Sequence, residues 1–131
     1  MSKYSYPAIF FPEGESGYSL RFPDLEGCYT CGSSMTEALV MGEDVLAFTL
    51  YDYEREQRTI PQPSQASDLS LKKGEFINFI ACDTIEYRKK QNKKMVKKTL
   101  TIPEWLNEAA TERNINFSQA LQEALVTKIE S

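Results

Sequence analysis

Residues 94–131 place the tightest limit on how this chain can fold. They begin with alternating apolar and polar residues, the pattern of a β-strand with two distinct faces. The apolar face of this strand holds Val96, Leu100 and Ile102. The polar face holds Lys97, Thr99 and Thr101. The strand therefore has one side to bury and one side to present.

Two short helices are predicted after this strand. Pro103 suits the first position of a helix, which we expect to end near Arg113. Asn116 is the expected N-cap of a second helix. Apolar residues recur at intervals of three and four in both helices, so each has one face to bury. The residues expected to share a core are Leu100, Ile102, Leu106, Leu121 and Leu125.

One strand and two short helices bury too little surface to fold alone. The chain has no histidine, and residues 94–131 hold no cysteine, so neither a metal nor a disulfide is expected to staple them. We therefore expect a homodimer in which two chains pair these strands antiparallel over four helices. Such a two-stranded ribbon fits the major groove of DNA.

This order of elements, over residues 94–129, resembles the ribbon-helix-helix DNA-binding module. The resemblance implies that Lys97, Thr99 and Thr101 read the bases of double-stranded DNA. It also implies that the backbone amides of Asn116, Phe117 and Ser118 bind phosphate. Amides at the start of a helix do attract anions. The alternative for the two threonines is an ordinary edge strand with solvated side chains.

Charge divides the chain in the same way. Residues 1–87 hold fourteen acidic and six basic side chains, whereas residues 88–98 hold seven basic and no acidic ones. We predict a domain over 1–87, a basic linker over 88–93 and a DNA-binding and dimerisation domain over 94–131. Lys93 and Lys94 are expected to bind phosphate, which gives a salt-dependent affinity. The alternative for the basic run is a solvated linker.

The N-terminal domain is predicted to be an antiparallel sheet with one long helix, which makes the whole chain α+β. Aromatic residues alternate along its first two strands, a pattern typical of a hairpin. The last strand is apolar on both faces and is expected to be central or covered. Gly42 predicts a close approach of the helix to the sheet. The strands are expected at 4–10, 18–22, 28–30 and 75–82, and the helix at 34–56.

A second resemblance rests on the N-terminal sequence. Residues 22–28 read Phe-Pro-Asp-Leu-Glu-Gly-Cys, and Gly32 and Glu37-Ala38-Leu39 follow them. Together with the C-terminal module, this resembles the HicB-type antitoxins of type II toxin-antitoxin systems. The resemblance implies a partial RNase H-like domain that masks a HicA-type mRNA-cleaving toxin. It further implies that the C-terminal module represses the operon by binding operator DNA.

The acidic balance of the first domain fits a partner that must itself bind RNA. A basic RNA-binding surface is attracted by an acidic one, which speeds their encounter. The acids expected to face the toxin are Glu13, Glu15, Asp24 and Glu26, all on predicted loops. Ordinary solvated loop acids are the alternative.

Several other functions are not expected. Without histidine the chain lacks the usual general base, and residues 4–11 lack the acid that an RNase H-type nuclease needs. We therefore predict no catalysis, no cofactor and no metal, with Cys28 and Cys31 as structural residues. No apolar run is long enough to span a membrane and no signal-peptide pattern is evident, so we expect a cytoplasmic protein. The functional alternative is a stand-alone repressor that senses a small ligand through its aromatic sheet face and its cysteines.

Overall fold

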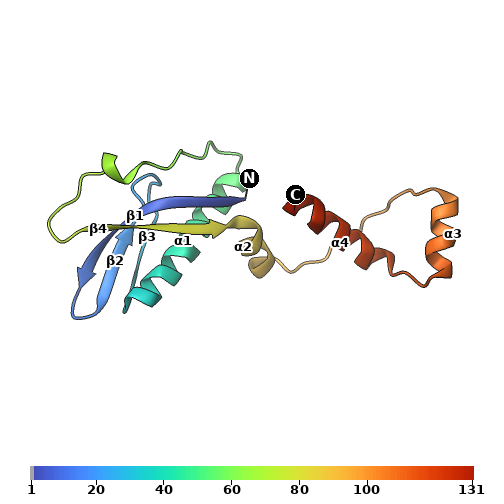
Figure 1. Cartoon of the computed structure of the whole chain (residues 1–131), viewed down its shortest axis with the longest axis horizontal. Coiled ribbons are helices and arrows are strands. Elements are labelled where there is room, and N and C mark those ends of the chain that lie inside the picture. The colour runs from blue at the N-terminus through green and yellow to red at the C-terminus, as the bar shows by residue number, and fades with distance from the viewer. Residues whose placement is uncertain (1) are drawn as a thin grey trace. The chain divides into compact units, whose positions relative to one another are not determined.

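The computed structural model describes residues 2–131, and the chain divides after Lys94 into two compact units. The first unit holds a β-sheet with helices α1 and α2, and the second holds helices α3 and α4 (Figure 1). The α+β class predicted from the sequence is confirmed. None of the helices in residues 2–131 combines the length and the apolar content needed to cross a membrane.

The sheet has four strands in the order β3-β2-β1-β4, and every neighbouring pair is antiparallel. The strands are β1 (Lys3–Glu13), β2 (Gly17–Arg21), β3 (Tyr29–Gly32) and β4 (Phe76–Asp83). The predicted hairpin is confirmed, with Phe10 of β1 opposite Leu20 of β2. Its turn contains Gly14 at φ +63°, a conformation that glycine adopts without steric cost.

The prediction that the last strand is central or covered is wrong. β4 is the end strand of the sheet, paired only with β1 among the described strands. Its residues alternate in burial, since Ile80 and Cys82 are buried whereas Phe79 is 55% exposed. Apolar side chains on both faces suggested burial on both sides, but α1 packs against only one face. β4 therefore leaves Phe79 in contact with solvent.

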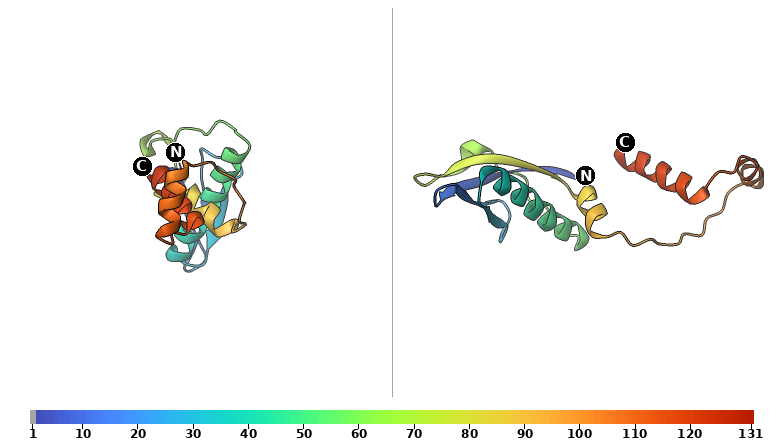
Figure 2. Two further views of the ribbon diagram at one scale, coloured as in Figure 1. Left: turned by 90° about the vertical axis from the view of Figure 1, so that its right-hand side faces the viewer. Right: turned by 90° about the horizontal axis from the view of Figure 1, so that it is seen from below.

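Helix α1 (Met35–Arg55) runs along one face of the sheet (Figure 2). Its N-cap is Ser34, whose hydroxyl accepts a hydrogen bond from the Glu37 backbone amide at 3.1 Å. The close approach predicted at Gly42 is confirmed. A Cβ atom there would lie 2.7 Å from Cδ1 of Ile80 and 2.9 Å from Cδ1 of Leu20. A side chain at this position would push α1 away from the sheet.

The hydrophobic core lies between α1 and this face of the sheet. Its buried residues are Tyr6, Ala8, Phe10, Leu20, Phe22, Leu25, Cys28, Ala38, Leu46, Ala47, Leu50, Tyr53, Ile80 and Cys82. The loop that leads to β4 is tied to the unit by polar contacts and carries a short 3-10 turn, η1 (Ala66–Asp68). The Tyr6 hydroxyl donates to the Pro61 carbonyl, and the Ser64 amide donates to the Asp24 carboxylate at 2.9 Å. These hydrogen bonds hold the loop against the rest of the first unit.

The prediction of a basic linker over 88–93 is wrong for its first part. Residues 88–91 belong to helix α2 (Thr84–Gln91). The Asp83 side chain caps this helix by accepting a hydrogen bond from the Ile85 amide at 2.9 Å, and Thr84 is fully buried. The positive charges of the last turn also suit the negative end of a helix dipole. Only the residues after Gln91 connect the two units.

The second unit contains the two predicted helices, α3 (Glu104–Glu112) and α4 (Phe117–Glu130). Asn114 turns the chain between them at φ +55°. Asn116 is the N-cap of α4, as predicted, and accepts a hydrogen bond from the Gln119 amide at 3.0 Å. Residues 96–102 form no strand in this single chain. A strand requires a hydrogen-bonded neighbour, and the neighbour expected here is a second chain.

Candidate functional site

The three residues expected to read DNA bases lie in the segment that leads into α3. Lys97, Thr99 and Thr101 are all exposed. Lys93 and Lys94, the expected phosphate-binding lysines, are exposed just before them. The sequence order therefore places four lysines, at positions 93, 94, 97 and 98, a few residues before the two helices of the second unit.

The expected phosphate site lies at the first turn of α4. The Asn116 side chain satisfies the Gln119 amide, and the Asn116 carbonyl accepts from the Ala120 amide at 3.0 Å. Phe117 and Ser118 occupy the first two helical positions, where backbone amides have no partner within the helix. A helix start with free amides is suited to a negatively charged oxygen.

The apolar residues of the second unit have almost nothing to pack against within one chain. Ala110 is the only buried residue between Met95 and Ser131. Among the expected core residues, Leu100 is 58% exposed and Leu125 is 52% exposed. Ile102 and Leu106 are also exposed, and Leu121 is half-buried. Units that bury so little surface usually fold together with a partner.

Further exposed apolar side chains in this unit were not identified as core candidates from the sequence. They are Trp105, Ile115, Phe117 and Val126; Ile129, which belongs to the apolar stripe expected for α4, is exposed as well. Their large exposed fractions extend the apolar surface over both helices and the turn between them. The sequence signal for Val126 was its position three residues before Ile129, a spacing that places both on one side of α4.

The four acids expected to face a toxin are not brought together. Glu13 and Glu15 lie at the β1–β2 hairpin, whereas Asp24 and Glu26 lie in the turn at the other end of β2. The Asp24 carboxylate accepts hydrogen bonds from the amide and the hydroxyl of Ser64. These acids therefore do not form one surface.

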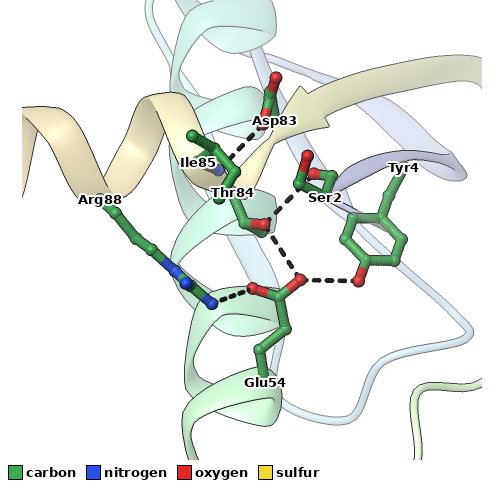
Figure 3. Close-up of polar contacts among 7 residues, drawn as sticks. All are labelled: Ser2, Tyr4, Glu54, Asp83, Thr84, Ile85 and Arg88. Carbon is green, nitrogen blue, oxygen red and sulfur yellow. Dashed lines mark hydrogen bonds and ion pairs between the residues drawn. The ribbon is translucent and has the colours of Figure 1, made fainter. Parts of the chain in front are cut away.

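A polar cluster around Glu54 was missed by the sequence analysis (Figure 3). The Glu54 carboxylate accepts hydrogen bonds from the Tyr4 hydroxyl at 2.7 Å and from the Thr84 hydroxyl at 3.0 Å. Its other oxygen lies 2.8 Å from the Arg88 guanidinium. Burial, and next the bond to Glu54, raise the pKa of Tyr4. The cluster joins β1, α1 and α2.

Aromatic contacts add to this junction. The Tyr87 ring centroid lies 5.7 Å from that of Tyr51 and 6.5 Å from that of Phe48. The Arg88 guanidinium lies 5.2 Å from the Tyr51 ring centroid, within cation–π range. The i, i+4 spacing of Thr84 and Arg88 was the one sequence signal that both face the same side. α2 is therefore docked on α1.

Cys28 and Cys31 lie in different environments. Cys28 is buried beside Thr49, whose hydroxyl donates to its sulfur at 3.4 Å, whereas Cys31 is exposed on β3. Burial raises the pKa of the Cys28 thiol, which keeps it protonated. Over residues 2–131, no three histidine, cysteine or acidic side chains gather closely enough to hold a metal ion.

Comparison with known proteins now identifies the family. A family model described as the HicB-like antitoxin of bacterial toxin-antitoxin systems matches residues 6–126, nearly the whole chain. The chain belongs to the HicB-like antitoxin family. The match begins in β1 and ends in α4, so it includes parts of both units.

Individual relatives agree with this assignment. A curated relative, Antitoxin HicB 2 of Photorhabdus laumondii, is 36% identical over 64 residues. That match covers 49% of this chain, and this chain spans only about half (46%) of the relative.

Solved structures of the family cover more of the chain. A toxin-antitoxin complex from Streptococcus pneumoniae contains a chain that is 33% identical, with a TM-score of 0.62. The alignment covers 96% of this chain and 99% of that one. The crystal structure of antitoxin HicB3 is 28% identical, with a TM-score of 0.52 and coverages of 96% and 98%. The α+β architecture of this chain is therefore that of solved HicB antitoxins.

Proposed function

We propose that this HicB-like antitoxin binds and neutralises a HicA-type mRNA-cleaving toxin through its first unit and represses its own operon through its second. The observation that carries the antitoxin role is the 33% identical chain of a toxin-antitoxin complex, which aligns with 96% of this chain. In this proposal the protein is cytoplasmic, has no catalytic role and needs no cofactor. Its first unit is a partial RNase H-like sheet.

The second unit is proposed to be a ribbon-helix-helix module. Its exposed apolar side chains, led by Leu100, Ile102 and Leu125, support a homodimer in which residues 96–102 of two chains pair. Pairing would satisfy the backbone groups of this segment, which have no strand partner in one chain. It would also place Lys97, Thr99 and Thr101 of both chains on one ribbon surface.

The phosphate contacts are assigned to the flanks of this ribbon. Lys93 and Lys94 precede it, and the free amides of Phe117 and Ser118 follow at the start of α4. Contacts to phosphate fix the position of the protein, whereas contacts to base edges give sequence specificity. The basic segment thus supports non-specific affinity for operator DNA, and the ribbon supports selectivity.

The first unit supports toxin binding better than ligand sensing. Ligand sensing would require an accessible aromatic face on the sheet. Tyr6, Phe10 and Phe22 of that face are almost fully buried under α1. The excess of acidic side chains in the first unit instead suits a basic protein partner. Stand-alone repression is therefore not proposed as a second function.

Two assays test the two halves of the proposal. Co-expression of the full chain with the HicA-type toxin of its operon is expected to restore growth, and the purified proteins are expected to form a stable complex. The full chain is expected to retard a DNA fragment carrying the operon promoter, whereas residues 2–94 alone are expected to bind the toxin and not the DNA. Continued growth arrest with soluble antitoxin present contradicts the antitoxin role, and promoter DNA that runs unretarded contradicts the repressor role.

A further inference from the structure

The outer side of α1 in the first unit carries large apolar side chains that stay exposed, although the Tyr87 ring contacts Phe48 from one side. Val40 is 62% exposed, Met41 is 41% exposed and Phe48 is 54% exposed. Phe48 follows Met41 by seven residues, which places both on one side of the helix, and Val40 lies next to them. Helix faces that contact only water are usually polar. This exposed face therefore suits a protein partner.

An acidic groove borders this face where α1, the end of β4 and α2 meet. Its volume is about 370 Å³, and Val40 and Tyr87 form part of its wall. Four carboxylates line it, opposed by a single ammonium group, that of Lys90. The carboxylates are those of Glu43, Asp44, Asp83 and Glu86. The groove thus combines apolar walls with an excess of negative charge.

Two of these carboxylates have no partner among residues 2–131. Asp83 caps α2, and Glu86 lies 3.0 Å from the ammonium of Lys89. Within residues 2–131, no hydrogen bond or ion pair involves the side chain of Glu43 or Asp44. Burial, followed by the charge of Glu43, raises the pKa of Cys82 to about 12. The groove therefore keeps an excess of negative charge, carried by Glu43 and Asp44.

The charge of this surface decides which partner fits it. A nucleic acid would be repelled, because its phosphates are negative. A second copy of the same face would oppose acids to acids. A basic protein fits, since the stem of a lysine or arginine can pack on Tyr87 while its charged end meets Glu43 and Asp44.

We propose that the outer face of α1 and the adjoining groove form the toxin-binding surface, and that the groove accepts a lysine or arginine side chain of the toxin. This inference rests on the proposed function, in which the toxin presents a basic RNA-binding surface. Occupying that basic side chain would remove it from RNA. The antitoxin would then inhibit by competing with RNA phosphate for the same positive charge.

Titration calorimetry with the full antitoxin chain and an inactive variant of the toxin of its operon tests this surface. The double variant Glu43→Lys and Asp44→Lys is expected to weaken toxin binding at least tenfold. A matched control, Glu56→Lys with Asp68→Lys, makes the same charge change at exposed positions outside this surface and is expected to bind within twofold of wild type. A third variant, Met41→Ala with Phe48→Ala, is expected to weaken binding without a charge change.

Thermal unfolding of each variant confirms that it is folded before binding is compared. Unchanged affinity in the Glu43 and Asp44 variant overturns the inference, as does an equal loss in the matched control. A selective loss in Glu13→Lys with Glu15→Lys, with the groove variant unaffected, would place the toxin at the hairpin instead. If the wild-type chain does not bind the toxin, the proposed function itself fails, which separates that result from failure of the groove alone.

Discussion

The Glu54 carboxylate and the Arg88 guanidinium, 34 residues apart in sequence, lie 2.8 Å from each other and fasten α2 to α1. The side chain of Glu54 is only 14% exposed, so this carboxylate depends on its three donors, Tyr4, Thr84 and Arg88. A buried charge is costly unless it is paired and hydrogen-bonded. The first basic residue of the run after the acidic domain therefore serves the fold of the first unit.

Replacing Glu54 by alanine is expected to lower the free energy of unfolding of the first unit by about 2 kcal/mol, because it removes three hydrogen bonds to a charged group. Arg88→Ala is expected to cost about 1 kcal/mol, since Arg88 is 43% exposed and solvent screens the pair. Urea unfolding of residues 2–94 measures both changes. The control is Lys89→Ala, whose ion pair with Glu86 is exposed and is expected to contribute little. Equal losses in Arg88→Ala and Lys89→Ala would contradict the role of this pair.

Gly42→Ala tests the contact between α1 and the sheet. The added methyl group would crowd Cδ1 of Ile80 and Cδ1 of Leu20, and overpacking of this kind costs about 1–3 kcal/mol. Alanine also favours a helix by about 1 kcal/mol over glycine, so a net loss of about 1 kcal/mol is expected. Adding Ile80→Val, which removes the nearer methyl, should recover part of the loss. A melting temperature higher than that of wild type in Gly42→Ala would show that the core adapts freely.

The DNA-binding prediction concerns exposed side chains in the segment that precedes α3. Thr99→Ala with Thr101→Ala is expected to weaken binding to the operator, while thermal unfolding and dimerisation stay unchanged. Binding to unrelated DNA should change little, because lysines supply that affinity. Gel-shift titrations with both DNAs measure the difference. The control is Thr36→Ala, an exposed threonine at the start of α1 in the other unit.

Salt dependence tests the basic segment separately. The logarithm of the binding constant is expected to fall linearly with the logarithm of salt concentration, by about 0.9 per phosphate neutralised. Lys93→Ala with Lys94→Ala should make this slope less steep, on both specific and unrelated DNA. Arg88→Ala should leave it unchanged, because Arg88 is paired with Glu54. A slope that does not respond to the lysine variants would remove them from the interface.

The buried thiol of Cys82 predicts a loss of stability in alkali. Burial, and next the charge of Glu43, raise the pKa of the Cys82 thiol to about 12. The pKa of a thiol in an unfolded chain is about 8.5. Between these values the folded state binds more protons than the unfolded state, so the free energy of unfolding falls as pH rises. The contribution is complete below about pH 8.5 and is lost as pH rises through about 12. Urea unfolding at several pH values should show a shallower fall in Cys82→Ala.

The elements that the sequence determined by itself are those with local signals. Alternation identified the β1–β2 hairpin, the Ser34 cap and helical periodicity identified α1, and Asn116 identified the start of α4. Gly42 also predicted the close contact of α1 with the sheet. Glycine destabilises the interior of a long helix, so its presence there indicates that a side chain would not fit. The motif at residues 22–28 and the division of charge along the chain indicated the HicB-like antitoxin family. Each of these depends on residues that are near one another in the chain.

The tertiary structure decided what depends on distant neighbours. A strand that is apolar on both faces does not reveal whether it is central, and only the sheet order places β4 at the edge. A run of positive charge is polar in any conformation, and only the pairing of Arg88 with Glu54 makes its first residues part of a docked helix. The acidic groove needs α1, β4 and α2 together. Strand order and side-chain pairing are set by long-range packing, which is why local patterns alone did not reveal them.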